Sequence, residues 1–279
     1  MMRALLFMLS LAVALRAYAQ FKLPDINVNR LLDTARNLSK AAREPDEKEE
    51  IAIGNDVAAR LLGAAPLMAD ARTQEYVNRV GRWLALQSER PDLPWRFGVL
   101  DAPQVNAFAV PGGTIFITRG LLAKMTSEAE LAGVLAHEIV HVVKKHHLKA
   151  MQKGALASLS ADAAGAALSN VNSEARNKLI SFGTEMYSRG LDKGDELEAD
   201  RLGVVIAARG GYDPYGLAAV LQTLQAMNAA DSALALMFKT HPAPGERLDA
   251  LGRMQAMLDA YSAQPQLRER FVAETQAPR

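Results

Sequence analysis

The feature of this sequence that most constrains its fold is a group of histidines at the end of an apolar segment. Four of the five histidines lie between positions 137 and 147, directly after the apolar run 131–136. His137 and His141 are four residues apart, so on a helix both rings project from one face, about one turn apart. Two such rings can bind one small metal ion, and Glu138 beside them can accept a proton. The spacing predicts a helix that carries a metal site.

The helix around this motif is apolar on almost every side, so we expect it to be buried. Its apolar positions are Val134, Leu135, Ile139, Val140, Val142 and Val143. Buried imidazoles and a buried carboxylate are costly unless they are paired or bind a metal. A chance match to the pattern would fall more often on a solvated helix. Metal binding therefore explains the motif better, and His-Glu-x-x-His is typical of zinc-dependent peptidases.

An acidic segment at residues 195–201 offers a third ligand. A catalytic zinc takes three protein ligands and keeps one position for water, and this chain has no cysteine to serve as one. Glu196 and Asp200 share a helix face, whereas Glu198 points elsewhere. This predicts Glu196 as the ligand and Asp200 as the acceptor for the second N–H of a ligating imidazole. The alternative is an acidic, solvated first helical turn, which the helix dipole also favours.

Together these motifs resemble peptidase family M48, over roughly residues 45 to 255. The matching sequences are His-Glu-x-x-His at 137–141, Glu-Leu-Glu-Ala-Asp-Arg-x-Gly at 196–203, Gly-Tyr-Asp-Pro at 211–214, Asn-Ala-Phe-Ala-Val-Pro-Gly-Gly at 106–113, Gly-Leu-Leu at 120–122 and Thr-His-Pro-Ala-Pro-Gly-Glu-Arg at 240–247. The resemblance implies a mostly helical α+β fold, a zincin-like metalloprotease domain with a small sheet or hairpin beside the active-site helix.

The resemblance also implies an edge strand that binds substrate, formed by Asn106, Ala107, Phe108 and Ala109. An extended peptide can add a strand to such an edge and so present its carbonyl to the metal. The alternative is an ordinary hairpin with both strands paired.

The expected chemistry is hydrolysis of a peptide bond by a zinc-activated water, with one Zn²⁺ per chain. Zinc would lower the pKa of its bound water toward roughly 7. Glu138 would accept that proton and pass it to the leaving amine. The developing oxyanion needs another donor, and the matched loop offers His241 and Arg247. For Arg247 the alternative is a structural salt bridge with Glu246 or Asp249.

His241 lies in a Thr-His-Pro-x-Pro sequence, where two prolines stiffen a loop. Such a loop could place the imidazole in the open position of the zinc, which would silence the enzyme until substrate displaces it. The competing role is stabilisation of the transition state. His146 and His147 lie off the His137/His141 face by helical angle, so we interpret them as structural or surface groups.

The order of predicted elements supports the α+β class. Residues 45–50 resemble a helix start and residues 70–87 a second helix. Residues 95–100 are predicted as a strand, and 107–110 with 114–117 as a hairpin. Helices follow to the end of the chain, so a small sheet lies between two helical regions. The small-residue stretch 151–177 is interpreted either as a packing helix or as a flap beside the cleft.

We expect four parts: a signal peptide at 1–19, a polar segment with a short helix at 20–44, the zinc metallopeptidase domain at 45–262 and a C-terminal tail at 263–279. Arg3, the apolar run 4–15 and a small-x-small site at 17–19 are typical of a cleaved secretory signal, with a retained anchor as the alternative. The absence of cysteine suits an oxidising compartment. We therefore expect a periplasmic or secreted protein.

These features predict a metalloendopeptidase in envelope protein quality control, acting on misfolded or misassembled envelope proteins. The 32 basic and 31 acidic residues include no long basic run, so nucleic acid is not an expected partner. We expect no spanning membrane segment after signal cleavage, which disfavours prenyl-protein processing, and peripheral membrane association stays open. The alternative function is a zinc-stabilised, non-proteolytic chaperone or assembly factor. Glu138 argues against it, because binding alone needs no base.

Overall fold

The computed structural model describes residues 43–154, 190–227 and 232–275. The predicted signal peptide, the short helix near residues 28–42 and most of the 151–177 stretch lie outside the described residues. The first described helices and strands are α3 (Glu47–Ala64), α4 (Ala71–Ala85), β1 (Arg96–Leu100), β2 (Ala107–Val110), β3 (Thr114–Thr118), α5 (Arg119–Leu122) and α6 (Glu128–Val143). They are followed by α9 (Lys193–Arg209), α10 (Gly216–Ala226), α11 (Ala235–Thr240), α12 (Pro244–Gly252), α13 (Gln255–Asp259) and α14 (Arg268–Thr275). The mostly helical α+β class is confirmed.

The three strands form one sheet in the order β1-β3-β2, with β1 parallel and β2 antiparallel to β3. The β2–β3 hairpin turns through Gly112 and Gly113, both at positive φ, where glycine carries no Cβ penalty. Because side chains alternate along a strand, the sheet packs on both faces. Phe97, Ala109 and Ile115 join the main core, while residues such as Phe108 on the other face contact the cluster beneath α3. Because β3 is the middle strand, β2 forms one edge of the sheet.

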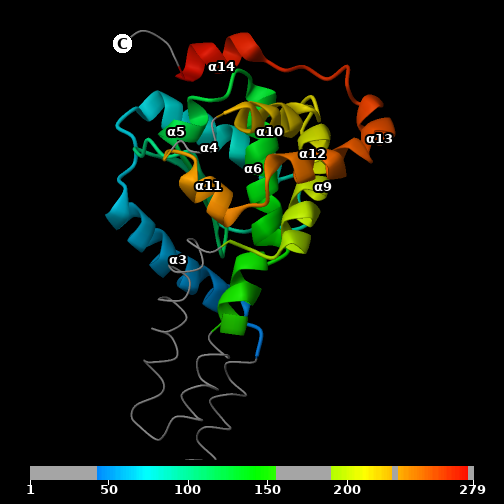
Figure 1. The fold of residues 1–279 in the computed structure, drawn as a ribbon. Helices are drawn as coiled ribbons and strands as arrows, with labels where there is room; N and C mark the ends of the chain where they lie inside the picture. The colour runs from blue at the N-terminus through cyan, green and yellow to red at the C-terminus, as the bar shows by residue number, and fades with distance from the viewer. Residues whose placement is uncertain (1–42, 155–189, 228–231, 276–279) are drawn as a thin grey trace, which may run out of the picture.

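Helix α6 runs through the middle of the fold, with α9 alongside it (Figure 1). Ser127 caps its first turn by accepting a hydrogen bond from the backbone N–H of Glu130. Every residue from Glu128 to Val142 is buried, as the apolar sequence predicts. Helix α9 approaches closely at Gly203, where a Cβ would lie 2.9 Å from the backbone nitrogen of His137. This close packing brings the side chains of α9 onto the histidine face of α6.

The predicted C-terminal tail contains a helix that packs on the core. In α14 the side chain of Phe271 is fully buried and meets Tyr76 edge to face, at 6.4 Å between ring centroids. Arg270 forms an ion pair with buried Glu128 at the start of α6. The packed structure therefore extends beyond residue 262, because a buried aromatic side chain and the ion pairs of Arg270 and Glu274 anchor an otherwise polar helix.

Among the described residues, no helix combines the length and apolar character that a bilayer crossing requires.

Candidate metal centre and active site

His137 and His141 of α6 and Glu196 of α9 bring three possible ligands together. The two Nε2 atoms lie 3.0 Å apart. Of the Glu196 oxygens, Oε2 lies 3.7 Å from His137 Nε2, and Oε1 lies 3.6 Å from His141 Nε2. At metal–ligand distances of about 2.0–2.1 Å, ligand atoms at the corners of a tetrahedron lie roughly 3.3 Å from one another. The observed separations bracket that value, so the three side chains fit a single zinc-sized ion.

The chemistry of this group also fits a cation. Glu196 is 1% exposed, and its Oε2 accepts no hydrogen bond from any residue that the structure describes. Burial raises the pKa of Glu196 to about 8 and lowers the pKa values of His137 and His141 below their usual range. Desolvation thus disfavours the carboxylate, although a carboxylate is what a metal needs. A divalent ion would compensate that cost.

Glu138 lies beside the ligands on α6 and lines the same pocket as Glu196 and His241. Burial raises the pKa of Glu138 to about 8, against the opposing effects of Arg247 and of a hydrogen bond from the backbone N–H of Ala109. A carboxyl group whose pKa lies near neutral pH can both accept and release a proton, as a general base requires. The Ala109 contact also fixes Glu138 against the edge strand.

His137 is held by a buried carboxylate. Its Nδ1 lies 2.9 Å from Asp200 Oδ1, so Nδ1–H donates to Asp200 and leaves the Nε2 lone pair for a metal. Arg247 in turn donates to both Asp200 oxygens, from Nη2 at 2.6 Å and from Nε at 2.9 Å. The pKa of Asp200 is held well below its usual range, because Arg247 and His137 outweigh the effect of its burial. Asp200 thus lies within hydrogen-bonding distance of the second ring nitrogen of His137, and its role in orienting a ligand stays a prediction.

Arg247 is placed differently from the predicted salt bridge. It pairs with Asp200, 47 positions earlier, rather than with Glu246 or Asp249. Its Nη2 also lies 3.3 Å from Nδ1 of His137, on the side of that ring away from the ligand atom, and Asp200 accepts from Nε and Nη2 of the guanidinium. The fold thus positions Arg247 to hold Asp200 and, through it, the first histidine, while a role as oxyanion donor stays a prediction.

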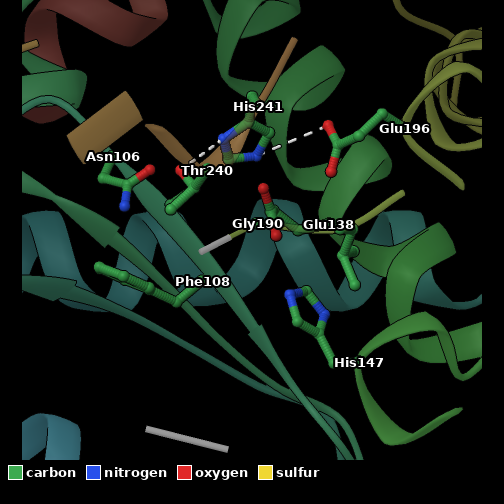
Figure 2. A pocket seen from close by; sticks show the side chains of 10 residues that line it. Asn106, Phe108, Glu138, His147, Gly190, Glu196, Thr240 and His241 are labelled. Atoms are coloured by element: carbon green, nitrogen blue, oxygen red, sulfur yellow. Dashed lines mark hydrogen bonds and ion pairs between the residues drawn. The ribbon is translucent and has the colours of Figure 1, made fainter. Parts of the chain in front are cut away.

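His241 turns its ring toward the ligand group, as Figure 2 shows. Its Nε2 lies 3.8 Å from Glu196 Oε2, and its ring centroid lies 5.9 Å from that of His137. Its Nδ1 lies 2.9 Å from Thr240 Oγ1, and this hydroxyl also donates to the carbonyl of Met237. Thr240 can therefore accept from His241 Nδ1–H, which leaves the Nε2 lone pair facing the metal position.

The predicted substrate strand lies at the pocket. Ala107 lines it, as do Asn106 and Phe108, which lie there with Glu138, Glu196 and His241 (Figure 2). Ala109 contacts Glu138. Asn106 is 1% exposed, and neither its amide oxygen nor its amide nitrogen has a partner among the described residues. An unsatisfied buried amide is costly. A peptide group of substrate could satisfy it.

Two histidines interpreted as structural or surface groups lie at the site instead. His146 is 3% exposed and its Nδ1 lies 3.0 Å from Nδ1 of His141, while His147 lines the pocket. Helical spacing fails here because α6 ends at Val143 and Lys145 adopts φ +58°. The helix is interrupted at this turn, so residues 146 and 147 no longer follow the angular spacing of α6. No sequence signal at position 145 predicts this turn.

Comparisons with known proteins agree with this geometry. The sequence model of peptidase family M48 matches residues 71–255. A beta-barrel assembly-enhancing protease from Yersinia pestis is 33% identical over 225 residues, which cover 75% of this chain and 44% of the relative. The metalloprotease LoiP from Escherichia coli is 29% identical over 231 residues, 83% of this chain and 81% of the relative. The mitochondrial metalloendopeptidase OMA1 from Schizosaccharomyces pombe is 29% identical over 177 residues, 63% and 51% of the two chains.

This chain spans less than half the length of the assembly-enhancing protease that it matches. The family match nevertheless covers more than half of the chain and includes the histidines of α6 and the acids of α9. The resemblance predicted from the motifs is confirmed: the chain belongs to peptidase family M48.

Proposed function

We propose that this protein is a zinc-dependent endopeptidase whose ligands are His137, His141 and Glu196 and whose general base is Glu138. The observation that carries the proposal is the convergence of three buried ligand side chains, whose Nε2 and carboxylate oxygen atoms approach one another to 3.0–3.7 Å, beside a second acidic side chain, Glu138. Zinc is favoured because two imidazoles and one carboxylate form a typical catalytic zinc set.

When bound, zinc supplies a Lewis acid that polarises the scissile carbonyl and acidifies the attacking water. Glu138 takes the proton from that water and returns it to the amine that leaves. Asp200 fixes the tautomer of His137, and Arg247 keeps Asp200 ionised and oriented. The amide of Asn106 binds a peptide group of the substrate as the substrate extends along β2.

We further propose that the substrates are polypeptides, in particular misfolded or misassembled envelope proteins, and that the protein acts in the periplasm or after secretion. Support comes from the similarity to a protease named for beta-barrel assembly and to LoiP. The non-proteolytic alternative, a zinc-stabilised chaperone, is disfavoured by the buried Glu138. A carboxyl group beside the ligands costs free energy that binding alone does not require.

The direct test is Glu138→Gln. We expect zinc content close to that of the wild type, and cleavage of casein reduced by at least about 100-fold, because proton transfer by a positioned base contributes that much or more. Elemental analysis and a protease assay on the same preparations measure both quantities. Glu89→Gln, at an exposed glutamate paired with Lys144, is the matched control. Persistent cleavage in Glu138→Gln, or a folded wild type that binds no zinc, would overturn the proposal.

His241 has two possible roles at this site, and its replacement by alanine distinguishes them. As an inhibitory fourth ligand it would occupy the open position, and His241→Ala would then raise cleavage of unfolded protein. As a stabiliser of the transition state its loss would lower cleavage. The 3.8 Å approach to Glu196 favours the inhibitory role, because it brings Nε2 among the ligand atoms. An unchanged or lowered rate in His241→Ala would exclude inhibition.

A further inference from the structure

We propose that His146 is a positioning residue for the metal, which orients His141 through a directed series of hydrogen bonds that ends at Glu198 on the surface. The proposal rests on the metal site of the proposed function. It adds a second group that orients a ligand, beside Asp200. His146 Nδ1 lies 3.0 Å from His141 Nδ1, and His146 Nε2 lies 3.1 Å from Glu198 Oε2. Glu198 is 40% exposed, whereas both histidines are buried.

The chemistry gives this series one direction. A neutral imidazole that offers Nε2 to a metal carries its proton on Nδ1, so His141 is the donor toward His146. His146 must then accept at Nδ1 and carry its own proton on Nε2. That proton points at the carboxylate of Glu198, which can only accept. Each group thus selects the tautomer of the next, from the surface to the ligand.

The backbone is shaped to make this contact. Helix α6 ends two residues after His141, and Lys145 takes the left-handed conformation at φ +58°. Residues other than glycine rarely adopt this conformation, because their Cβ then crowds the following carbonyl oxygen. Lys145 interrupts the helix, and His146 starts the next helical segment with its ring against His141, at 5.1 Å between centroids. Lys145 itself pairs with Glu44 and approaches Glu50, which helps to hold the turn.

The segment Glu196-Leu197-Glu198-Ala199-Asp200 thereby serves the metal in three ways. Glu196 is a ligand, Asp200 orients His137 directly, and Glu198 orients His141 through His146. Asp195, 3.7 Å from His146 Nε2, lies beyond hydrogen-bonding distance and does not replace Glu198 in this geometry.

The test measures zinc affinity directly, by competition with a chromogenic chelator, in wild type, His146→Leu, His146→Asn and Glu198→Ala. We expect His146→Leu to weaken zinc binding by about 10- to 100-fold, the usual effect of losing a partner that orients a ligand. Asn keeps an acceptor near the position of Nδ1, so His146→Asn should recover most of that loss. Glu198→Ala should cost about threefold, because water can replace an exposed carboxylate. Visible absorption of the cobalt-substituted proteins should change in the same order. Glu89→Ala is the control on another exposed acid.

Two results would overturn the proposal. One is a His146→Leu protein with the zinc affinity and cobalt spectrum of the wild type. The other is an equal loss in His146→Leu and His146→Asn, with equal drops in the melting temperature of the metal-free proteins, which would assign His146 to packing alone. If His146→Leu does not fold, Glu198→Ala decides: a zinc affinity weakened by about threefold supports the proposal, and a wild-type affinity contradicts it. A wild type without zinc defeats the proposed function, whereas wild-type zinc binding in His146→Leu defeats only this inference.

Discussion

Two buried glutamates, Glu128 and Glu196, occupy first turns of helices at the two ends of the α6–α9 core and meet opposite surroundings. Both are 1% exposed, and both gain from the dipole of their helix. Glu128 accepts hydrogen bonds from Tyr76 at 2.9 Å and Tyr212 at 2.8 Å, and pairs with Arg270. Glu196 has an oxygen without a donor among the described residues, and three imidazoles within 3.8 Å of its carboxylate.

The difference shows that burial of a carboxylate does not by itself identify a functional site. The informative feature is whether protein groups donate hydrogen bonds to that carboxylate. The hydrogen-bonding capacity of Glu128 is satisfied by protein groups, and these bonds hold α14, α4 and α6 together. Glu196 faces lone pairs of neutral imidazoles, since burial lowers the pKa values of these rings. A divalent cation would satisfy the carboxylate and these lone pairs together.

The largest expected effect is that of Glu196→Gln. It should weaken zinc binding by about 100-fold or more, beyond the range for partners that merely orient a ligand. Casein cleavage should fall by about 1000-fold, or about 4 kcal/mol in activation free energy. In a chelator its melting temperature should match that of the chelated wild type, because a neutral amide places no new charge in the core. Wild-type zinc binding in this variant would remove Glu196 from the ligand set.

Glu128→Ala should produce the reverse pattern. We expect the free energy of unfolding to fall by about 3 kcal/mol, since two tyrosines and one arginine lose a common acceptor. That corresponds to a drop of roughly 10 °C in melting temperature for a domain of this size. Zinc affinity, measured below the melting transition, should remain that of the wild type. If zinc affinity falls together with stability, the two glutamates are not separate in function.

The smallest expected effect is that of Tyr212→Phe, which removes one donor from Glu128 and keeps the ring. It should lower the free energy of unfolding by about 1 kcal/mol, with no change in cleavage. Tyr76→Phe is the matched variant, because it removes the other phenol from the same carboxylate. Urea unfolding of both proteins measures the effect. A loss above that of Glu128→Ala in either variant would contradict the assignment of the carboxylate as the centre of this cluster.

Much of the fold follows from local pattern. The apolar residues on almost every side of His137 predict the central buried helix, and two strand-like segments flanking Pro111-Gly112-Gly113 predict the hairpin. The spacing of Glu196 and Asp200 predicts their shared face on α9. These predictions succeed because residues on one helix or one hairpin are neighbours by backbone geometry alone.

Other contacts of the site could not be predicted from local sequence pattern. Arg247 meets Asp200 across 47 positions, His146 meets Glu198 across 52, and Arg270 meets Glu128 across 142. Each pairing depends on how two separate helices pack and on which rotamers fit between them. The left-handed turn at Lys145 is of the same kind, because tertiary contacts hold a conformation that lysine does not prefer.

By itself, the sequence determined the type of chemistry: two histidines and a glutamate at helical spacing in an apolar segment, with an acidic helix to complete the ligand set. The tertiary structure decided which groups hold those ligands and where Arg247, His146 and α14 belong. The physical reason is that spacing along a chain fixes directions within one element, whereas satisfaction of buried charges is settled only when the elements pack together.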